Sequence, residues 1–392
     1  MKAFVQKLAS EYEATQLAYF QHLHAHPEVS FAEYETSAYI KDALRGMGIR
    51  LMDGVSGTSV VGILEGKMPG PVIAFRADMD ALPIQEETGL PYQSVCAGVM
   101  HACGHDAHTA TLLTLAKVLA EHRELVKGTV KFIFQSAEEK LPGGGKQLCA
   151  EGVMQDVDAI YAYHCSSMVP LGVVATIVGA TSACVAKYDV VIHGKGGHIC
   201  NPDQALNPVP VACTMATTIN QLLAEKASPL EKAVVTVSYI HGGQRENIIA
   251  SEATLGGSIR TFNNALTEQL FQRLRDVCHG VCTAYGCTCD VTTTVGYPAA
   301  INTKAETEHI NQAVDALGYE RWETEPAMNG EDFSYYLLEK PGSMCYVGMA
   351  ADAPEDVAPH HNSKFQLNVK GLQVALELEL AVYLKATEQW DV

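Results

Sequence analysis

The first third of the chain has hydrophobic positions at the 3.6-residue spacing of amphipathic helices. Three segments show it, residues 2–24, 35–47 and 106–122. Short apolar runs rich in β-branched and aromatic residues alternate with these segments, as buried strands do. They occupy residues 72–75, 130–134 and 157–163. The alternation predicts an α/β fold, a mostly parallel sheet with helices on both faces.

The pattern changes near residue 180. From there a strand, a helix, two strands, a helix and a strand are predicted, at residues 187–193, 208 to about 225, 233–239, 254–260, 267–285 and 288–295. That order is typical of a ferredoxin-like α+β domain. The first pattern resumes near residue 297 and ends with a long helix at 372–388. We therefore expect a main domain of residues 1–181 and 297–392, interrupted by an inserted domain of residues 182–296.

Composition narrows the function classes. The chain has 392 residues, 47% of them hydrophobic, which suits two well-buried cores. Its 27 basic and 45 acidic residues give a net charge of −18, and such a surface repels nucleic acids and anionic membranes. No run reaches the ~18 to 20 apolar residues of a membrane span. We expect a soluble protein without a nucleic-acid or membrane partner.

Twelve cysteines could indicate a disulfide scaffold. The chain opens, however, with a charged amphipathic segment and no signal-like run, so we expect reduced thiols and a cytoplasmic location. The densest cluster is Cys278, Cys282, Cys287 and Cys289. Its spacing differs from a zinc ribbon, with two members four apart on a predicted helix and two on one face of a predicted strand. Core packing is the favoured interpretation and a structural zinc site the alternative.

Residues 100–109, MHACGHDAHT, hold three imidazoles, a thiol and a carboxylate. Neutral imidazole and thiolate are preferred ligands of zinc and related ions. Gly104 lets the backbone turn so that Cys103 and His105 can point at one centre. The alternative is a polar loop with an incidental cysteine, and the downstream residues favour a metal site over it.

Those downstream residues stand at predicted strand ends, where open α/β sheets place their chemistry. Glu138 and Glu139 follow the run at 128–134, where one carboxylate can bind a metal while the other takes a proton from water. His164 ends the run at 157–163, and His361 follows a proline-containing loop near the C-terminus. A solvated acidic turn and a surface histidine pair are the alternatives.

Eight ordered motifs between residues 24 and 362 carry a family resemblance. They are HAHPE at 24–28, RADMDALPIQE at 76–86, the decapeptide at 100–109, AEE at 137–139, GKGGH at 194–198, NII at 247–249, GEDFS at 330–334 and HN at 361–362. Together they resemble the dinuclear-metal peptidases and amidohydrolases, which include aminoacylases, carboxypeptidases and hippurate hydrolase. The chain is most similar to the N-acyl-amino-acid amidohydrolase branch.

The resemblance implies a set of metal ligands. By position they are Cys103, His105, Glu139, His164 and His361, which would bind two divalent ions of zinc, manganese, cobalt or nickel. Cys103 matches a bridging ligand, and Glu138 matches the general base. Asp80 matches a second-shell residue that orients a ligand histidine.

The resemblance also implies that the inserted domain mediates a homodimer or a higher oligomer. His198 matches a histidine that reaches the partner subunit's active site and stabilises the oxyanion. Asn247 and Arg260 match residues that hold the substrate's carboxylate, a task suited to the planar guanidinium. Gly330 matches a backbone position beside the substrate.

The expected function is metal-dependent hydrolysis of the amide bond of small N-acyl amino acids, either hippurate-like or N-acetyl conjugates, with Glu138 as the base. Within the same chemistry the alternatives are an N-acetyl-diaminopimelate deacetylase and a dipeptidase or carboxypeptidase. A catalytically inert metal-binding relative and a thiol enzyme using Cys103 are alternatives of other classes. Residues that depart from the family pattern, such as Cys165 and Ile199, leave the acyl group open.

Overall fold

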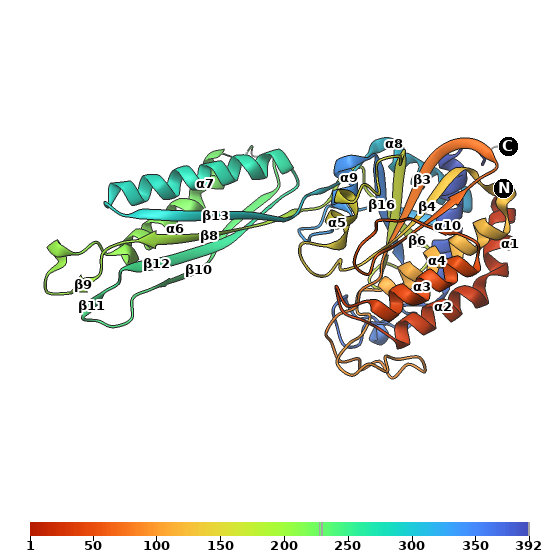
Figure 1. The fold of residues 1–392 in the computed structure, drawn as a ribbon, viewed down its shortest axis with the longest axis horizontal. Coiled ribbons are helices and arrows are strands. Elements are labelled where there is room, and N and C mark those ends of the chain that lie inside the picture. The colour runs from red at the N-terminus through yellow and green to blue at the C-terminus, as the bar shows by residue number, and fades with distance from the viewer. Residues whose placement is uncertain (227, 229, 391–392) are drawn as a thin grey trace. The chain divides into compact units, whose positions relative to one another are not determined.

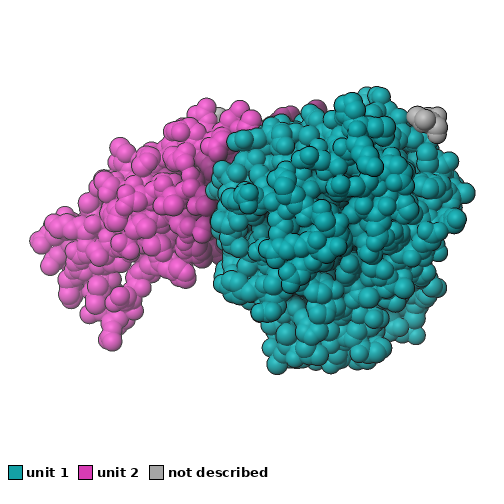
Figure 2. Space-filling model, turned by 45° about the vertical axis from the view of Figure 1, so that its right-hand side comes forward, with its two compact units in different colours: residues 1–179, 301–325, 332–392 teal, residues 180–300, 326–331 magenta. Residues whose placement is uncertain are grey.

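The computed structural model describes residues 1–226, 228 and 230–390. These form two compact units, coloured separately in Figure 2. Unit 1 comprises residues 1–179, 301–325 and those from 332 onward, and unit 2 comprises residues 180–300 and 326–331. The three-part domain division stays a prediction, and its residues 227, 229, 391 and 392 lie outside the described residues.

Unit 1 is built around an eight-stranded sheet (Figure 1). Its strands are β1 (Arg50–Leu51), β2 (Val60–Glu65), β3 (Met68–Asp78), β4 (Lys127–Gln135), β5 (Ala159–Ser166), β6 (Val173–Thr176), β15 (Glu320–Glu323) and β16 (Gly342–Gly348). Across the sheet they run β1-β2-β4-β3-β5-β16-β6-β15. Pairs β4–β3, β3–β5, β5–β16 and β6–β15 are parallel, whereas β1–β2, β2–β4 and β6–β16 are antiparallel. The predicted mostly parallel α/β sheet is confirmed, with antiparallel strands near both edges.

The helices of unit 1 cover both faces of this sheet. They are α1 (Lys2–Glu11), α2 (Glu13–Ala25), α3 (Tyr34–Gly46), α4 (His105–Glu121), α5 (Gly144–Ala150), α8 (Lys304–Leu317), α9 (Ser334–Glu339) and α10 (Lys370–Ala386), with short 3-10 turns η1 (Arg123–Leu125) and η3 (Pro354–Asp356). The single helix predicted over residues 2–24 is wrong. The helix is interrupted at Tyr12, whose N–H donates to the carbonyl of Ala9 and closes a turn tighter than that of an α-helix.

Strand β4 shows why the run at residues 132–134 is apolar at consecutive positions. Phe132 and Phe134 point into the large core shared with α4, α8 and α10. Ile133, between them, points into a second core that contains Leu148 of α5 and Tyr336 of α9. A strand buried on both faces needs apolar residues at consecutive positions, so it lacks polar alternation. Burial of each large side chain contributes about 1.5 to 3 kcal/mol.

Unit 2 has six main elements, β8 (Cys184–His193), α6 (Pro208–Lys226), β10 (Ala233–Gly242), β12 (Glu252–Thr261), α7 (Asn264–Ala284) and β13 (Thr288–Tyr297). Its antiparallel sheet has the order β10-β12-β8-β13. Both helices pack on one face of this sheet through a common hydrophobic core (Figure 1). Order and topology are those of the predicted ferredoxin-like fold. Shorter elements are η2 (Pro202–Gln204) and the pair β9 (Gly197–His198) and β11 (Ile248–Ile249), while β7 (Gly179–Ser182) and β14 (Ala300–Asn302) lie where the chain passes between units.

The cysteine cluster of unit 2 is part of the core. Cys278, Cys282, Cys287 and Cys289 are all buried among the apolar side chains there, as the core-packing interpretation predicts. Cys287 precedes β13, which begins at Thr288, so its predicted place in the strand is wrong. All twelve cysteines of the chain are free thiols. Among the described residues, no helix combines the length and apolar character of a membrane span.

Candidate metal centre

Candidate ligands meet where several elements of unit 1 begin or end. Parallel strands β3, β4 and β5 have their carboxyl ends at one edge of the sheet. His164 lies near the end of β5, and Glu139 lies four residues after the end of β4. Cys103 and His105 stand at the start of α4, and His361 comes from the loop before α10. The cluster therefore lies where open α/β sheets place their functional residues, at the carboxyl ends of the parallel strands.

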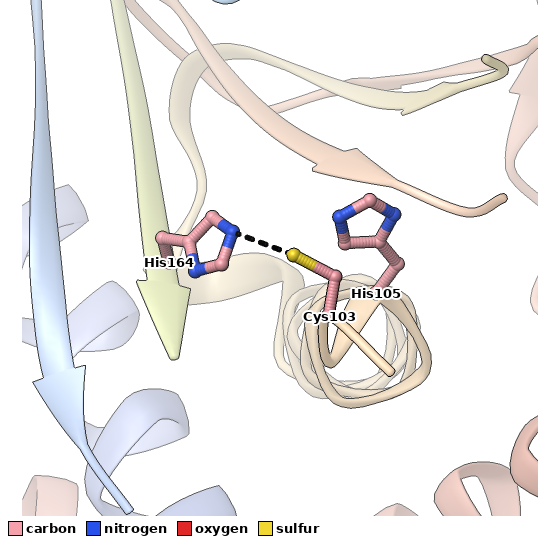
Figure 3. A group of neighbouring side chains, drawn as sticks. All are labelled: Cys103, His105 and His164. Carbon is pink, nitrogen blue, oxygen red and sulfur yellow. Dashed lines mark hydrogen bonds between the residues drawn. The ribbon is translucent and has the colours of Figure 1, made fainter. Parts of the chain in front are cut away.

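The ligand atoms form two overlapping groups. Those of Cys103, His105 and His164 lie within 4.8 Å of one another, and Figure 3 shows both imidazoles beside the thiol. Cys103 Sγ is 3.6 Å from His164 Nε2. The atoms of Cys103, Glu139 and His361 form the second group, in which His361 Nε2 is 3.0 Å from Glu139 Oε1. The structure thus brings the five predicted ligands together, with Cys103 common to both groups.

The donor atoms suit a divalent cation. His105 Nδ1 donates to the carbonyl oxygen of Asp80 at 2.9 Å, and His164 Nδ1 donates to that of Cys165 at 2.7 Å. Each bond leaves the ring's Nε2 atom as the candidate ligand. His105 Nε2 is buried and makes no hydrogen bond to the described residues. An orphaned buried nitrogen beside sulfur and carboxylate donors is the arrangement that a zinc-type ion satisfies.

The electrostatics of this cluster also favour a cation. Burial raises the pKa of the Cys103 thiol, which disfavours the thiolate in the chain alone. Burial lowers the pKa of His105, but Asp78, Cys103 and Asp80 raise it more, so that the net pKa lies above its ordinary value. A divalent cation would replace the protons held by the Cys103 thiol and the His105 ring.

Asp80 links the histidine to the two glutamates. Its Oδ1 accepts from the backbone N–H of Glu138 at 3.0 Å, and Oδ2 accepts from that of Glu139 at 3.1 Å. Its Oδ1 is also 3.2 Å from His105 Nδ1. Burial raises the pKa of Asp80, but hydrogen bonds from His105 and Ser30 bring it below its ordinary value, so the carboxylate stays charged. The predicted base and two predicted ligands share this one anchor.

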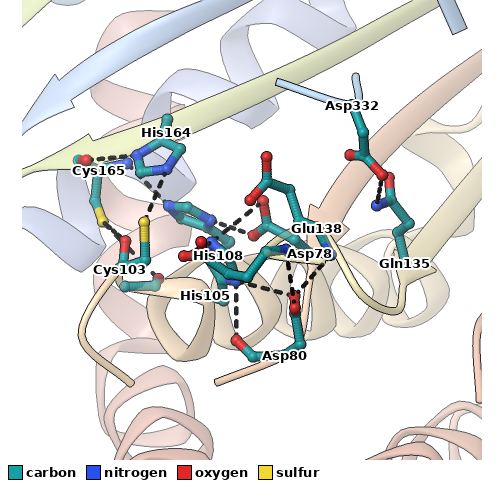
Figure 4. A network of polar contacts seen from close by, with 12 residues as sticks. Asp78, Asp80, Cys103, His105, His108, Gln135, Glu138, His164, Cys165 and Asp332 are labelled. Atoms are coloured by element: carbon teal, nitrogen blue, oxygen red, sulfur yellow. Dashed lines mark hydrogen bonds and ion pairs between the residues drawn. The ribbon is translucent and has the colours of Figure 1, made fainter. Parts of the chain in front are cut away.

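A second polar network adjoins the candidate ligands. Figure 4 draws its members Asp78, His108 and Asp332 together with several of those ligands. Arg76 contacts Asp78 at 2.6 Å and Asp332 at 2.7 Å. Asp78 Oδ1 accepts from His108 Nδ1 at 2.5 Å, while His108 Nε2 accepts from the backbone N–H of Cys165 at 2.9 Å. Burial lowers the pKa of His108 to about 4, which suits a neutral ring that donates on one side and accepts on the other. No role was predicted from sequence for Asp78 or His108, although both stand in motifs that carry the family resemblance.

A third buried cluster was also missed. His24 Nδ1 lies 2.6 Å from Asp106 Oδ2, and His24 Nε2 lies 3.2 Å from Glu86 Oε1. These residues belong to three of the quoted motifs, so the motifs themselves were the available signal. The spacing of these motifs in sequence does not predict that a histidine at residue 24 contacts carboxylates at residues 86 and 106.

The remaining predicted site residues belong to unit 2. His198 is exposed in β9, opposite Ile248 of β11, and Asn247 directly precedes that strand. Arg260 is half-buried in β12, and its burial lowers its pKa. Gly330 packs so closely that an added Cβ would lie 2.5 Å from Val185 Cγ2. The roles of these residues stay predictions.

Three comparisons relate this chain to known proteins. The profile of "Peptidase family M20/M25/M40" matches residues 74–384. The chain is 38% identical over 372 residues to IAA-amino acid hydrolase ILR1-like 2 of Arabidopsis thaliana, covering 93% of this chain and 84% of that protein. It is 35% identical over 368 residues to N-acetylcysteine deacetylase of Bacillus subtilis, covering 93% and 95%. The crystal structure of the Bacillus subtilis YxeP protein, described as a dinuclear metal-binding peptidase of family M20, matches with a TM-score of 0.85 and 30% identity over 97% and 99% of the two chains.

Proposed function

Because this chain belongs to peptidase family M20/M25/M40, a family of metal-dependent hydrolases, we propose that it releases a free amino acid from an N-acyl amino acid. The observation that carries the proposal is the meeting of five donor side chains with Glu138 at one edge of the sheet. Two relatives support the substrate class, because their names describe the deacetylation of N-acetylcysteine and the hydrolysis of an IAA-amino acid.

Two divalent ions would be held by five side chains, those of Cys103, His105, Glu139, His164 and His361, of which Cys103 belongs to both groups of neighbouring ligand atoms. When bound, such ions polarise the amide carbonyl and lower the pKa of a water molecule toward neutrality. Sulfur, nitrogen and oxygen donors together suit zinc, and they also accept manganese, cobalt or nickel.

Glu138 is the general base of the proposal. One of its carboxylate oxygens lies within 4.8 Å of ligand atoms of His105 and Glu139. Glu138 therefore borders the metal centre, but it belongs to neither of the two groups of ligand atoms described above. It takes a proton from the attacking water and delivers that proton to the leaving amine. Asp80 fixes the backbone of Glu138, which restricts where its carboxylate can reach.

Residues of unit 2 complete the proposed site across a homodimer. His198 of one subunit stabilises the oxyanion in its partner's site, as an aimed donor does in acyl transfer. Arg260 and Asn247 hold the free carboxylate of the substrate, and Arg260 presents two parallel donors for that purpose. Gly330 lets the backbone approach the substrate, since it carries no Cβ.

The function is tested with a panel of N-acyl amino acids. Protein stripped with a chelator and refilled with zinc, manganese, cobalt or nickel is assayed for amino-acid release, with N-acetyl-diaminopimelate and dipeptides included. We expect no turnover after stripping and recovery with at least one metal. Glu138→Gln should lower kcat by orders of magnitude at unchanged metal content. Metal uptake without turnover on any amide, or activity that survives stripping, would refute the proposal.

The dimer is tested by complementation. Single variants His198→Ala and Glu138→Gln are each expected to be nearly inactive, and mixing them under subunit exchange creates a site with an intact base and an intact partner histidine. Recovery of activity on mixing supports action across the dimer. A solution mass equal to one chain, 42.2 kDa, or no recovery after proven exchange would exclude it.

A further inference from the structure

We propose that Glu33, a residue far from the cluster in sequence, is a positioning residue for the general base. It would act by holding the backbone at Ala137, which directly precedes Glu138. The inference rests on the proposed role of Glu138 and adds the element that aims it. Glu33 contacts Ala137 through a hydrogen bond from the backbone N–H to Oε1 at 2.8 Å.

The turn at residues 137–139 is held by carboxylates at each position. Ala137 donates its N–H to Glu33, and the next two N–H groups donate to the two oxygens of Asp80. Ala137 has a φ of +53°, in the left-handed region that non-glycine residues avoid, and it is fully buried. A strained residue at a functional turn persists only where its surroundings enforce it. The bond from Ala137 to Glu33 is one such constraint.

Glu33 is itself fixed on both sides. It is fully buried at the start of α3, where its carbonyl accepts from the N–H of Ser37. Its second carboxylate oxygen accepts from Thr58 Oγ1 at 2.6 Å. The neighbouring Ser59 Oγ accepts from the N–H of Ser136 at 3.1 Å. Segments at residues 33 and 58–59 thus hold the chain immediately before the base.

Glu33 and Asp80 act on different parts of the centre. Asp80 contacts His105 and the backbone of Glu139, both candidate ligands, so its loss would disturb metal binding and base together. Glu33 reaches the centre through Ala137 alone among its hydrogen bonds, one residue before the base. Removing the Glu33 carboxylate should therefore move Glu138 while Asp80 still holds Glu139. Proton transfer depends steeply on such placement, and a ~1 Å error costs about 100-fold in rate.

The experiment compares three changes on one substrate that the wild type hydrolyses. Glu33→Ala removes the acceptor, and we expect kcat to fall by about 10- to 100-fold with KM within about threefold and unchanged metal content by mass spectrometry. Glu33→Gln keeps an acceptor oxygen for Ala137 and should recover most of this loss. Glu35→Ala removes an exposed carboxylate from the first turn of α3 and serves as the matched control, with kcat near wild type. If Glu33→Ala does not fold, Glu33→Asp withdraws the oxygen by one methylene and should show an intermediate loss.

A double-variant cycle with Glu138→Gln separates positioning from general destabilisation. If Glu33 acts through the base, Glu33→Ala adds no further loss to the residual turnover of Glu138→Gln. The same fold loss on both backgrounds, a kcat equal to wild type, or a loss that parallels metal content would overturn the positioning role. Wild-type turnover of Glu138→Gln by itself would instead overturn the base assignment in the proposed function.

Discussion

Replacing His24 with glutamine should destabilise the protein strongly below pH 6.5 and much less above pH 9. The side chain of His24 is 4% exposed and lies between the carboxylates of Asp106 and Glu86. Burial lowers the pKa of His24, but hydrogen bonds and charge from these two groups raise it to about 9. The folded state therefore binds a proton that the unfolded chain, with a pKa near 6.5, releases at neutral pH.

The size of the effect follows from linkage. A pKa raised from 6.5 to about 9, at about 1.4 kcal/mol for each pH unit, corresponds to roughly 3 kcal/mol of stability. Because the folded pKa is the higher one, this stabilisation is fully present below pH 6.5 and is lost as pH rises through about 9. His24→Gln lacks this term at every pH. The difference in free energy of unfolding between wild type and His24→Gln should therefore decrease by about 3 kcal/mol between pH 6.5 and 9.5.

The assay is urea unfolding followed by circular dichroism at pH 6.5, 8 and 9.5. Chelator-treated protein is used so that pH-dependent metal binding does not contribute. His26→Gln is the matched control, because His26 is exposed at the end of the same helix and its ring forms a hydrogen bond with the backbone carbonyl of His22 rather than with a carboxylate. A gap between wild type and His24→Gln that stays constant or widens with pH would refute the reasoning.

Three further predictions concern other buried groups. Gly104→Ala should abolish metal uptake, since Gly104 has a φ of +87° and a new Cβ would lie 2.1 Å from Cys165 Sγ; full metal content in the purified variant would contradict this. Glu379→Gln should raise the midpoint of thermal unfolding at pH 8 but not at pH 4.5, because burial raises the pKa of Glu379 and the wild type loses stability as pH rises above the ordinary value of 4.5. Equal midpoints at pH 8 would count against it. Arg76→Met should cost about 3 to 5 kcal/mol in urea unfolding, because it removes the cation that contacts both of the buried carboxylates Asp78 and Asp332, and a loss below about 1 kcal/mol would show that these charges are stabilised otherwise.

The fold was largely predictable because its signals are local. Each apolar run that predicted a strand lies within an observed strand or overlaps one, as residues 130–134 do with β4. The six-element order of unit 2 could be read in sequence because each main strand and helix is long enough to show its own hydrophobic period. Strand direction was less accessible. The antiparallel pairing of β2 with β4 depends on which edge the chain returns to, and hydrophobic periodicity carries no such information.

The candidate ligands were found for a similar reason, since each stands in a short motif of unusual composition. The groups that hold them were not. Glu33 and Ala137 are 104 residues apart, and His108 meets Cys165 across 57 residues. Glu33 has no distinguishing neighbours in sequence. Its sequence context does not show whether its carboxylate faces solvent or accepts a hydrogen bond from a distant part of the chain. Supporting contacts of this kind are set by tertiary packing, which a single sequence does not display.

The pairing of β5 with β16 has a consequence for synthesis on the ribosome. All six main elements of unit 2, residues 184–297, emerge between these two strands, so unit 2 can complete its sheet while the sheet of unit 1 is still missing a central strand. His361 is made later still, within the last tenth of the chain. A nascent chain therefore exposes the edge of β5 until β16 has been made, and its donor set stays incomplete until His361 has followed. We expect unit 2 to gain protease resistance before the donor cluster of unit 1 forms.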